Sequence, residues 1–202
     1  MMSILAEVRK ETRPWHDKME EVARSDKIAA GTLSIAEYKA VILGHYVFHQ
    51  QAEKRLKANE LLKITQGLQL DERFKTPSLL QDMRQLNMEP LIFDFCPDLH
   101  LDTLPRALGC MYVMEGATLG GTVIGRYLQK VPEITSSGAM HYYGCYGDQT
   151  GKRWKQFKEI VEREVSTEDE GQAFVHAATV TFRQYAECME RAFQQLEITA
   201  TR

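Results

Sequence analysis

The segment ALGCMYVMEGATLGGTVIGRYLQK, residues 107–130, decides the fold class of this chain. Apolar and helix-compatible residues flank the heptapeptide EGATLGG, residues 115–121, on both sides. We therefore expect one long helix from about Leu104 to Gln129. No run of residues in the chain shows the alternation and turn chemistry of a strand, so the chain is expected to be all-α.

Three glycines, Gly116, Gly120 and Gly121, lie inside this expected helix. Each costs about 0.8–1.0 kcal/mol of helix stability relative to alanine. A helix with this spacing of glycines exposes a stripe of bare backbone. Such a stripe suits either the close packing of another helix or the close approach of a flat, largely apolar ligand, and the pattern alone leaves both open.

Helix signals also dominate the two ends of the chain. An amphipathic helix is expected over about Ile4–Ala23, and it should kink or begin afresh at Pro14. A capping box at residues 34–37 opens a helix that runs to about Ala58. A second capping box at residues 167–170 opens a final helix, whose apolar residues keep the 3.6-residue period to about Leu196.

Shorter helices are expected at Glu60–Ile64, Ser78–Asn87 and Gly151–Val165, with a loop over Thr135–Thr150. The sequence thus predicts a single domain spanning residues 1–202. Its architecture should be an irregular all-α bundle of about seven to eight helices.

Composition excludes several classes of protein. The net charge of −3 is spread along the chain, so we expect no nucleic-acid partner and no membrane surface. No signal peptide and no run of about 20 apolar residues is evident, which indicates a cytoplasmic protein. The four cysteines form no CxxC pair, which favours free thiols over a zinc site.

Two groups of histidines are candidate ligands. His16 lies one helical turn before Glu20, whose carboxylate can hold one ring nitrogen and leave the other for a metal; on spacing alone, a surface His–Glu pair is the favoured alternative. His45, His49 and Glu53 share one face of their helix. They suit a metal site, but an exposed polar stripe is the favoured interpretation.

Two motifs together resemble the heme oxygenase family, and most closely its bacterial, biliverdin-producing branch. The first is T-x-x-x-H-x-x-x-E at residues 12–20, and the second is EG-x-x-LGG at residues 115–121. The likeness extends to G-x-x-W-x-x-F at residues 151–157 and AA-x-x-TF at residues 177–182. The resemblance implies the heme oxygenase-type helical bundle.

The resemblance also implies site residues. His16 would be the proximal ligand of heme b, the substrate and cofactor, with Glu20 as its hydrogen-bonding partner. Gly116 and Gly120 would form the bare backbone above the heme, where the oxygen chemistry takes place. The remaining residues implied to contact or hold the heme are Arg9, Thr12, Tyr112, Gly121, Phe182 and Tyr185, with Lys155 and Arg126 as weaker candidates.

The implied reaction is the cleavage of heme to biliverdin, ferrous iron and carbon monoxide. It consumes O2 and takes electrons from an external reductase or a ferredoxin, and a phytochrome is a possible acceptor of the biliverdin. The protein would supply ligation, orientation and a controlled pocket, while the heme carries most of the chemistry.

Other functions stay open at this level. A heme-binding or heme-sequestering protein could keep the same fold without turnover. A thiaminase-like relative would need a nucleophilic cysteine, Cys110 or Cys145, and a di-iron oxidase would need His45 and His49 with further carboxylates. In a pure interaction protein, the glycines would form a helix-packing seam.

Overall fold

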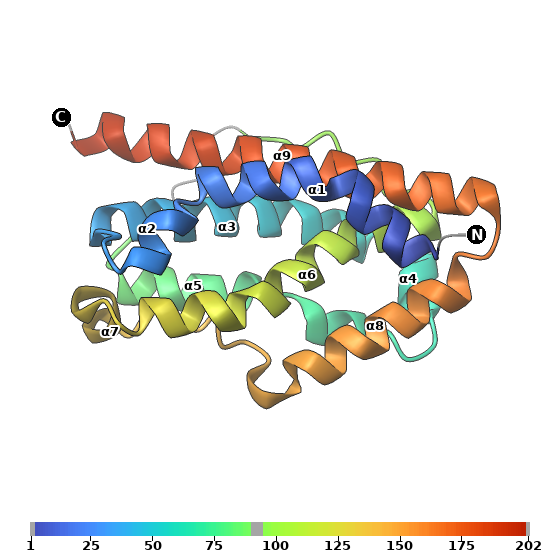
Figure 1. Ribbon diagram of the computed structural model, residues 1–202, viewed down its shortest axis with the longest axis horizontal. Helices are drawn as coiled ribbons and strands as arrows, with labels where there is room; N and C mark the ends of the chain where they lie inside the picture. The colour runs from blue at the N-terminus through green and yellow to red at the C-terminus, as the bar shows by residue number, and fades with distance from the viewer. Residues whose placement is uncertain (1–2, 90–94, 201–202) are drawn as a thin grey trace.

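The chain folds into nine α-helices and two short 3-10 helices over residues 3–89 and 95–200, the parts that this computed structural model describes (Figure 1). No β-strand occurs in those two ranges, which confirms the all-α prediction. The α-helices are α1 (Ile4–Val22), α2 (Ser25–Ala30), α3 (Ile35–Lys57), α4 (Glu60–Ile64), α5 (Thr76–Gln85), α6 (Leu104–Leu128), α7 (Pro132–Ser137), α8 (Thr150–Glu164) and α9 (Glu168–Ala200). The 3-10 helices are η1 (Leu70–Arg73) and η2 (Gly147–Gln149).

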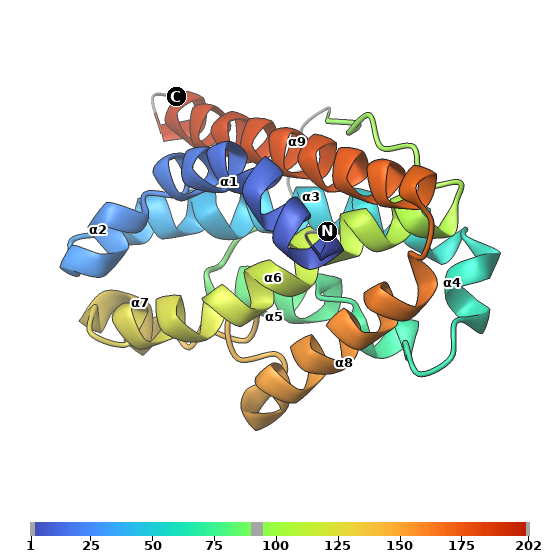
Figure 2. The ribbon, with the colours of Figure 1, turned by 45° about the vertical axis from the view of Figure 1, so that its right-hand side comes forward.

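Local signals fix the ends of the long helices. At the start of α3, the Ser34 hydroxyl accepts the Glu37 N–H and the Glu37 carboxylate accepts the Ser34 N–H, which confirms the capping box. The same reciprocal pair of hydrogen bonds joins Thr167 and Glu170 before α9. Pro14 lies inside α1 without dividing it, so the expected new helix start is absent. The ribbon of α1 instead changes direction in its first half (Figure 2).

Helix α9 runs the length of the molecule and packs against α1, α3 and α6 (Figures 1 and 2). Two glycines allow close contact there. A Cβ on Gly44 of α3 would lie 2.7 Å from the sulfur of Met189, and one on Gly109 of α6 would lie 2.4 Å from the Phe174 carbonyl oxygen. These glycines therefore serve helix packing.

The central position of α6 explains its apolar character. Among the described residues it is the one helix long and apolar enough to cross a membrane, contrary to the expectation that no segment approaches this composition. However, 56% of its most apolar 18-residue window is buried inside the fold. A core helix of a bundle has the same composition, because neighbouring helices cover it on several sides.

Two short helices were missing from the sequence prediction. Helix α2 follows α1 after a left-handed residue, Arg24, and ends at the left-handed Gly31. Helix α7 has Pro132 in its first turn and Gly138 as a left-handed C-cap, and its second half lies in the predicted loop over Thr135–Thr150. Together they raise the count above the seven or eight helices expected, without changing the architecture.

Candidate functional site

A cavity of about 840 Å³ separates α1 from α6. Helix α2 and the 139–146 loop line one end of it, and α8 lines the other. Most of its walls are apolar, and this size is typical of small-molecule and cofactor sites. The apolar residues are Leu5, Ala6, Met19, Ala23, Ile28, Ala117, Leu119, Ile124 and Phe182, with Trp154 from α8.

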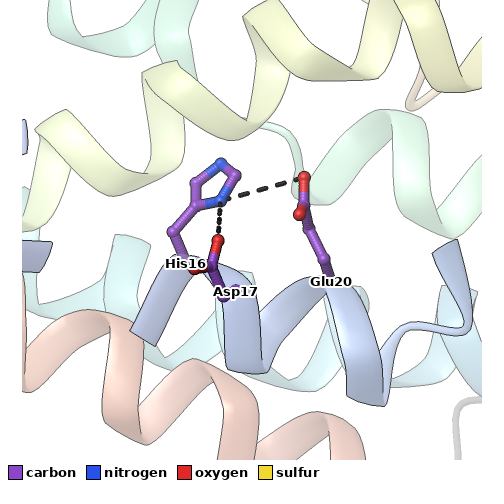
Figure 3. Close-up of side chains that lie close together, drawn as sticks. All are labelled: His16, Asp17 and Glu20. Carbon is purple, nitrogen blue, oxygen red and sulfur yellow. Dashed lines mark ion pairs between the residues drawn. The ribbon is translucent and has the colours of Figure 1, made fainter. Parts of the chain in front are cut away.

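His16 lines the cavity from α1 (Figure 3). Its Nδ1 lies 3.8 Å from a carboxylate oxygen of Glu20 and 3.8 Å from one of Asp17, which also pairs with Arg13 at 2.8 Å. The second ring nitrogen lies on the far side of the ring from both carboxylates and points toward α6 (Figure 3). The three side chains form a group that could hold a metal ion through Nδ1, and the second nitrogen is free for a ligand in the cavity.

The glycines of α6 divide into two kinds. Gly116 and Gly120 line the cavity: a Cβ on Gly116 would have only Trp154 nearby, at 3.8 Å, and one on Gly120 would meet no atom within 4 Å. Gly121 and Gly125 instead receive Tyr143, at 3.3 and 3.4 Å from their would-be Cβ atoms. Part of the glycine stripe therefore forms a bare cavity wall, and part makes room for a loop tyrosine instead of another helix.

A polar group lies at the α8 end of the cavity. Arg9 and Tyr112 both line it, and the positive charge of Arg9 partly offsets the rise in the pKa of Tyr112 that burial causes. Lys158 of α8 lines the same cavity, whereas the weaker candidates Lys155 and Arg126 are exposed and outside its lining. Lys155 pairs instead with Glu159 at 3.9 Å. The sequence motifs gave no reason to select Lys158.

Two further predicted residues lie beside His16. Phe182 of α9 lines the cavity and meets the His16 ring edge-on, with 5.9 Å between ring centroids. Thr12 lines the cavity from α1, but it is almost fully buried and its hydroxyl donates to the Val8 carbonyl at 2.6 Å. The Thr12 hydroxyl therefore satisfies the helix backbone.

Tyr185 lies behind the cavity wall instead of in the lining. It is 1% exposed, stacks on Phe48 with 4.0 Å between ring centroids, and its hydroxyl lies 2.5 Å from Nδ1 of His45. A direct contact with a ligand in the cavity, as the resemblance implied, is not available in this arrangement. Tyr185 is connected to the cavity indirectly, because it contacts His45 and His45 lines the cavity.

The prediction that His45, His49 and Glu53 form an exposed polar stripe is wrong. They are 7%, 0% and 3% exposed, and His49 Nδ1 donates to Glu53 at 3.2 Å. The three residues do share one face of α3, as their spacing requires. That face is covered, however, by Tyr142, Tyr143 and Tyr185.

A buried ionic cluster anchors α6 directly before Gly116. The Glu115 carboxylate pairs with Arg73, accepts from Lys75 at 3.1 Å and accepts from the Tyr146 hydroxyl at 2.7 Å. Arg73, Lys75 and Glu115 are all at least 97% buried. The sequence did not reveal this cluster, because its members come from segments far apart in the chain.

The two candidate cysteine nucleophiles do not suit a thiaminase-like reaction. Cys110 is fully buried, and burial raises the pKa of its thiol to about 12. Burial also raises the pKa of Cys145. Both thiols therefore stay protonated near neutral pH, whereas a thiolate is the nucleophile.

Comparisons with known proteins show sequence similarity to heme oxygenases. Residues 98–191 match the family model for heme oxygenase. A curated heme oxygenase from Xanthomonas campestris pv. campestris (strain 8004) is 24% identical over 162 residues, which cover 80% of this chain and 94% of that protein.

Two solved structures share the fold. The NO- and CO-bound heme oxygenase from Neisseria meningitidis matches with a TM-score of 0.79 and 20% identity, covering 96% of this chain and 94% of that one. Heme oxygenase from Leptospira interrogans matches with a TM-score of 0.72 and 15% identity, covering 94% of this chain and all of that one. These matches confirm the resemblance read from the motifs: the chain is similar to heme oxygenases of bacteria and has the fold of the two solved structures.

Proposed function

We propose that the protein is a heme oxygenase, which cleaves heme b to biliverdin, ferrous iron and carbon monoxide with O2 and external electrons. One arrangement carries the proposal. His16 presents a free ring nitrogen to a cavity whose opposite wall includes the bare backbone of Gly116 and Gly120. A ligand for iron on one side and a wall without side chains on the other suit a flat macrocycle bound between them.

The remaining residues of the cavity fit the same group. The apolar side chains along both helices match the porphyrin faces, and the cavity volume of about 840 Å³ is within the range of cofactor sites. Heme also carries two propionates, which need cations or hydroxyl donors. Arg9, Lys158 and Tyr112 supply these at the α8 end.

Each residue would contribute to binding or orientation. Heme, when bound, supplies the redox chemistry and is itself the carbon skeleton that is cleaved. Neutral His16 would ligate through its free nitrogen, while a water bound to Nδ1–H would donate to the carboxylates of Glu20 and Asp17, each 3.8 Å from Nδ1, and so hold the ring in this orientation. Arg9, Lys158 and Tyr112 would fix the rotation of the ring, and so decide which of its edges lies under the glycines.

Gly116 and Gly120 would keep the space above the ring low and free of side chains. A bulkier residue would push a small ligand away from the ring edge, where the reaction must take place. We further propose that a reductase or a ferredoxin supplies the electrons, that the protein acts in the cytoplasm, and that a phytochrome is a possible acceptor of the biliverdin.

The first experiment is a hemin titration of the wild type, of His16→Ala and of His100→Ala, an exposed histidine outside the cavity that serves as control. We expect a stoichiometric Soret band in the wild type and the control, and a lost or shifted band in His16→Ala. Ascorbate under air, with an iron chelator, should then replace the band with the broad red absorbance of biliverdin.

Three outcomes separate the alternatives. Binding without conversion, also when a reductase or a ferredoxin replaces ascorbate, would contradict turnover and indicate a heme carrier. A Soret band that His16→Ala leaves unchanged would contradict the ligand assignment. The absence of any saturable Soret band would contradict the heme proposal altogether.

A further inference from the structure

A chain of buried side chains leads from the cavity to Glu53, which lies further along the same face of α3 as His45. It begins at Tyr143 and His45, which line the cavity, and continues through Tyr185, Tyr142 and His49. The five contacts, from the cavity inward, are Tyr143 Oη to His45 Nε2 at 3.3 Å, His45 Nδ1 to Tyr185 Oη at 2.5 Å, Tyr185 Oη to Tyr142 Oη at 3.4 Å, Tyr142 Oη to His49 Nε2 at 3.4 Å, and His49 Nδ1 to Glu53 Oε1 at 3.2 Å.

The charge states of these groups follow from their surroundings. Burial lowers the pKa of His45 to about 3 and lowers that of His49, so both rings are neutral at physiological pH. Burial raises the pKa of the three tyrosines, which keep their protons. The pKa of Glu53 is lowered, because its hydrogen bonds from His49 and from the backbone N–H groups of Lys75 and Thr76 outweigh the effect of burial.

The number of protons then fixes the direction of every hydrogen bond. Five neutral groups bring one hydrogen each to five contacts. Ionised Glu53 only accepts, so His49 must donate through Nδ1 and accept through Nε2. Tyr142 consequently donates to His49, and Tyr185 to Tyr142.

The last step of this order reaches the cavity. Because the Tyr185 hydrogen is used for Tyr142, the Tyr185 oxygen must accept from His45 Nδ1–H. The Nε2 of His45 is then an acceptor, and it receives the hydroxyl hydrogen of Tyr143. In the alternative order, Tyr185 donates to His45 Nδ1, His45 Nε2–H donates to Tyr143, and Tyr143 turns its hydrogen into the cavity. That order leaves the buried Tyr185–Tyr142 contact without a hydrogen.

We infer that Glu53 acts through this chain as a positioning residue: it holds His45 in its Nδ1–H form, so that Tyr143 donates to His45 and presents its own oxygen to the cavity as a hydrogen-bond acceptor. The single lone pair of His45 Nε2 is used by the Tyr143 hydrogen, so the Tyr143 oxygen is the acceptor that the cavity meets. A molecule bound there has to be a donor, and water is the donor of suitable size. By donating one hydrogen to this end, a water molecule keeps its second O–H directed into the cavity.

The value of such a water for oxygen chemistry rests on the proposed function; the order of the hydrogen bonds does not. In the alternative order, Tyr143 would instead turn its O–H into the cavity and donate to a small oxygen ligand directly. An acceptor instead holds a water that carries the hydrogen, and a water can be replenished after its proton has been used.

The test uses the ligand-free protein, labelled with 15N and studied by long-range 1H–15N correlation spectra of the histidine rings. In the wild type we expect His45 and His49 each to have a protonated Nδ1 and an unprotonated Nε2. Tyr142→Phe removes the hydroxyl that joins Tyr185 to His49. The Tyr185 hydrogen should then turn to His45 Nδ1, so that His45 changes to its Nε2–H form while Glu53 holds His49 unchanged.

A control and a second variant complete the experiment. Tyr46→Phe removes the hydroxyl of a buried tyrosine of α3 that accepts from the Gln50 side chain, outside the chain of contacts, and it should leave both rings as in the wild type. If Tyr142→Phe does not fold, Tyr185→Phe should give the same change at His45. An Nε2–H or doubly protonated His45 in the wild type would overturn the inference, as would an unchanged His45 in the folded variants. Since no hemin is present, this result is independent of the hemin titration.

Discussion

Gly109 lies so close to Phe174 that a Cβ on the glycine would stand 2.4 Å from the Phe174 carbonyl oxygen, whereas a Cβ on Gly120 of the same helix would meet no atom within 4 Å. The two glycines have different reasons for lacking a side chain. Gly109 allows α6 to contact α9, and Gly120 leaves the cavity wall bare. Substitution by alanine distinguishes these two roles. Alanine favours the helix at both positions, but only at Gly109 does its methyl group clash with α9.

Gly120→Ala should stabilise the fold by up to about 1 kcal/mol, since alanine favours the helix and its methyl group meets open space. Gly109→Ala should destabilise it by roughly 1–3 kcal/mol through overpacking. Urea unfolding of both variants checks these signs. Gly120→Ala should also weaken hemin binding or slow its conversion, because the methyl group enters the cavity. Unchanged hemin binding and conversion together would contradict a role for the bare wall.

Glu20 and Asp17 each lie 3.8 Å from Nδ1 of His16, but Asp17 is held by Arg13. We therefore expect Glu20 to be the stronger partner of the imidazole. Glu20→Gln should lower hemin affinity by roughly 10-fold or more, as the loss of hydrogen-bonding partners of metal ligands does elsewhere. Asp17→Asn is the matched variant and should have the smaller effect. Competition with a hemin-binding protein of known affinity measures both, and the reverse order would assign the role to Asp17.

Acid should destabilise the fold through the buried histidines. The pKa of His45 falls from 6.5 in the unfolded chain to about 3 in the fold, so protons bind the unfolded chain first. The stability is complete above pH 6.5 and is lost as the pH falls toward about 3, by about 1.4 kcal/mol per pH unit for one such group.

Replacement of His45 tests how much this ring contributes to the pH dependence of the free energy of unfolding. His45→Gln should reduce the loss of stability between pH 7 and about pH 5 by roughly 2 kcal/mol. His100→Gln, at an exposed site, should leave the loss unchanged. Urea unfolding at several pH values gives both slopes. If the free energy of unfolding fell equally with pH in the wild type and in His45→Gln, the fold would not lower the pKa of His45.

Lys75 should matter far more for stability than Lys155, although each pairs with a glutamate. Lys75 is fully buried against Glu115, and its removal by Lys75→Met leaves part of a buried carboxylate charge uncompensated. We expect a loss of about 3 kcal/mol. Lys155→Met breaks an exposed pair with Glu159 and should change stability by no more than about 0.5 kcal/mol. Equal effects in chemical denaturation would contradict the importance of the cluster.

The long helices could be predicted because their signals are local. The capping boxes at Ser34 and Thr167 involve residues only three positions apart, and the apolar period continues through α9. Helix α7 also had usable signals, Pro132 at its start and Gly138 after its end. Helix α2 had weaker ones, since its six residues follow a left-handed Arg24 without a side-chain cap.

For the candidate site, spacing along the chain was enough to predict which residues share a helix face: His16 with Glu20, His45 with His49 and Glu53, and Gly116 with Gly120. What each face contacts depends on how the helices pack together. The packing covers the His45 face with three tyrosines, opens Gly120 to the cavity and brings Lys75 to Glu115. The physical reason is that helical period depends on neighbours along the chain, whereas burial, cavity walls and ion pairs depend on segments that meet only after folding.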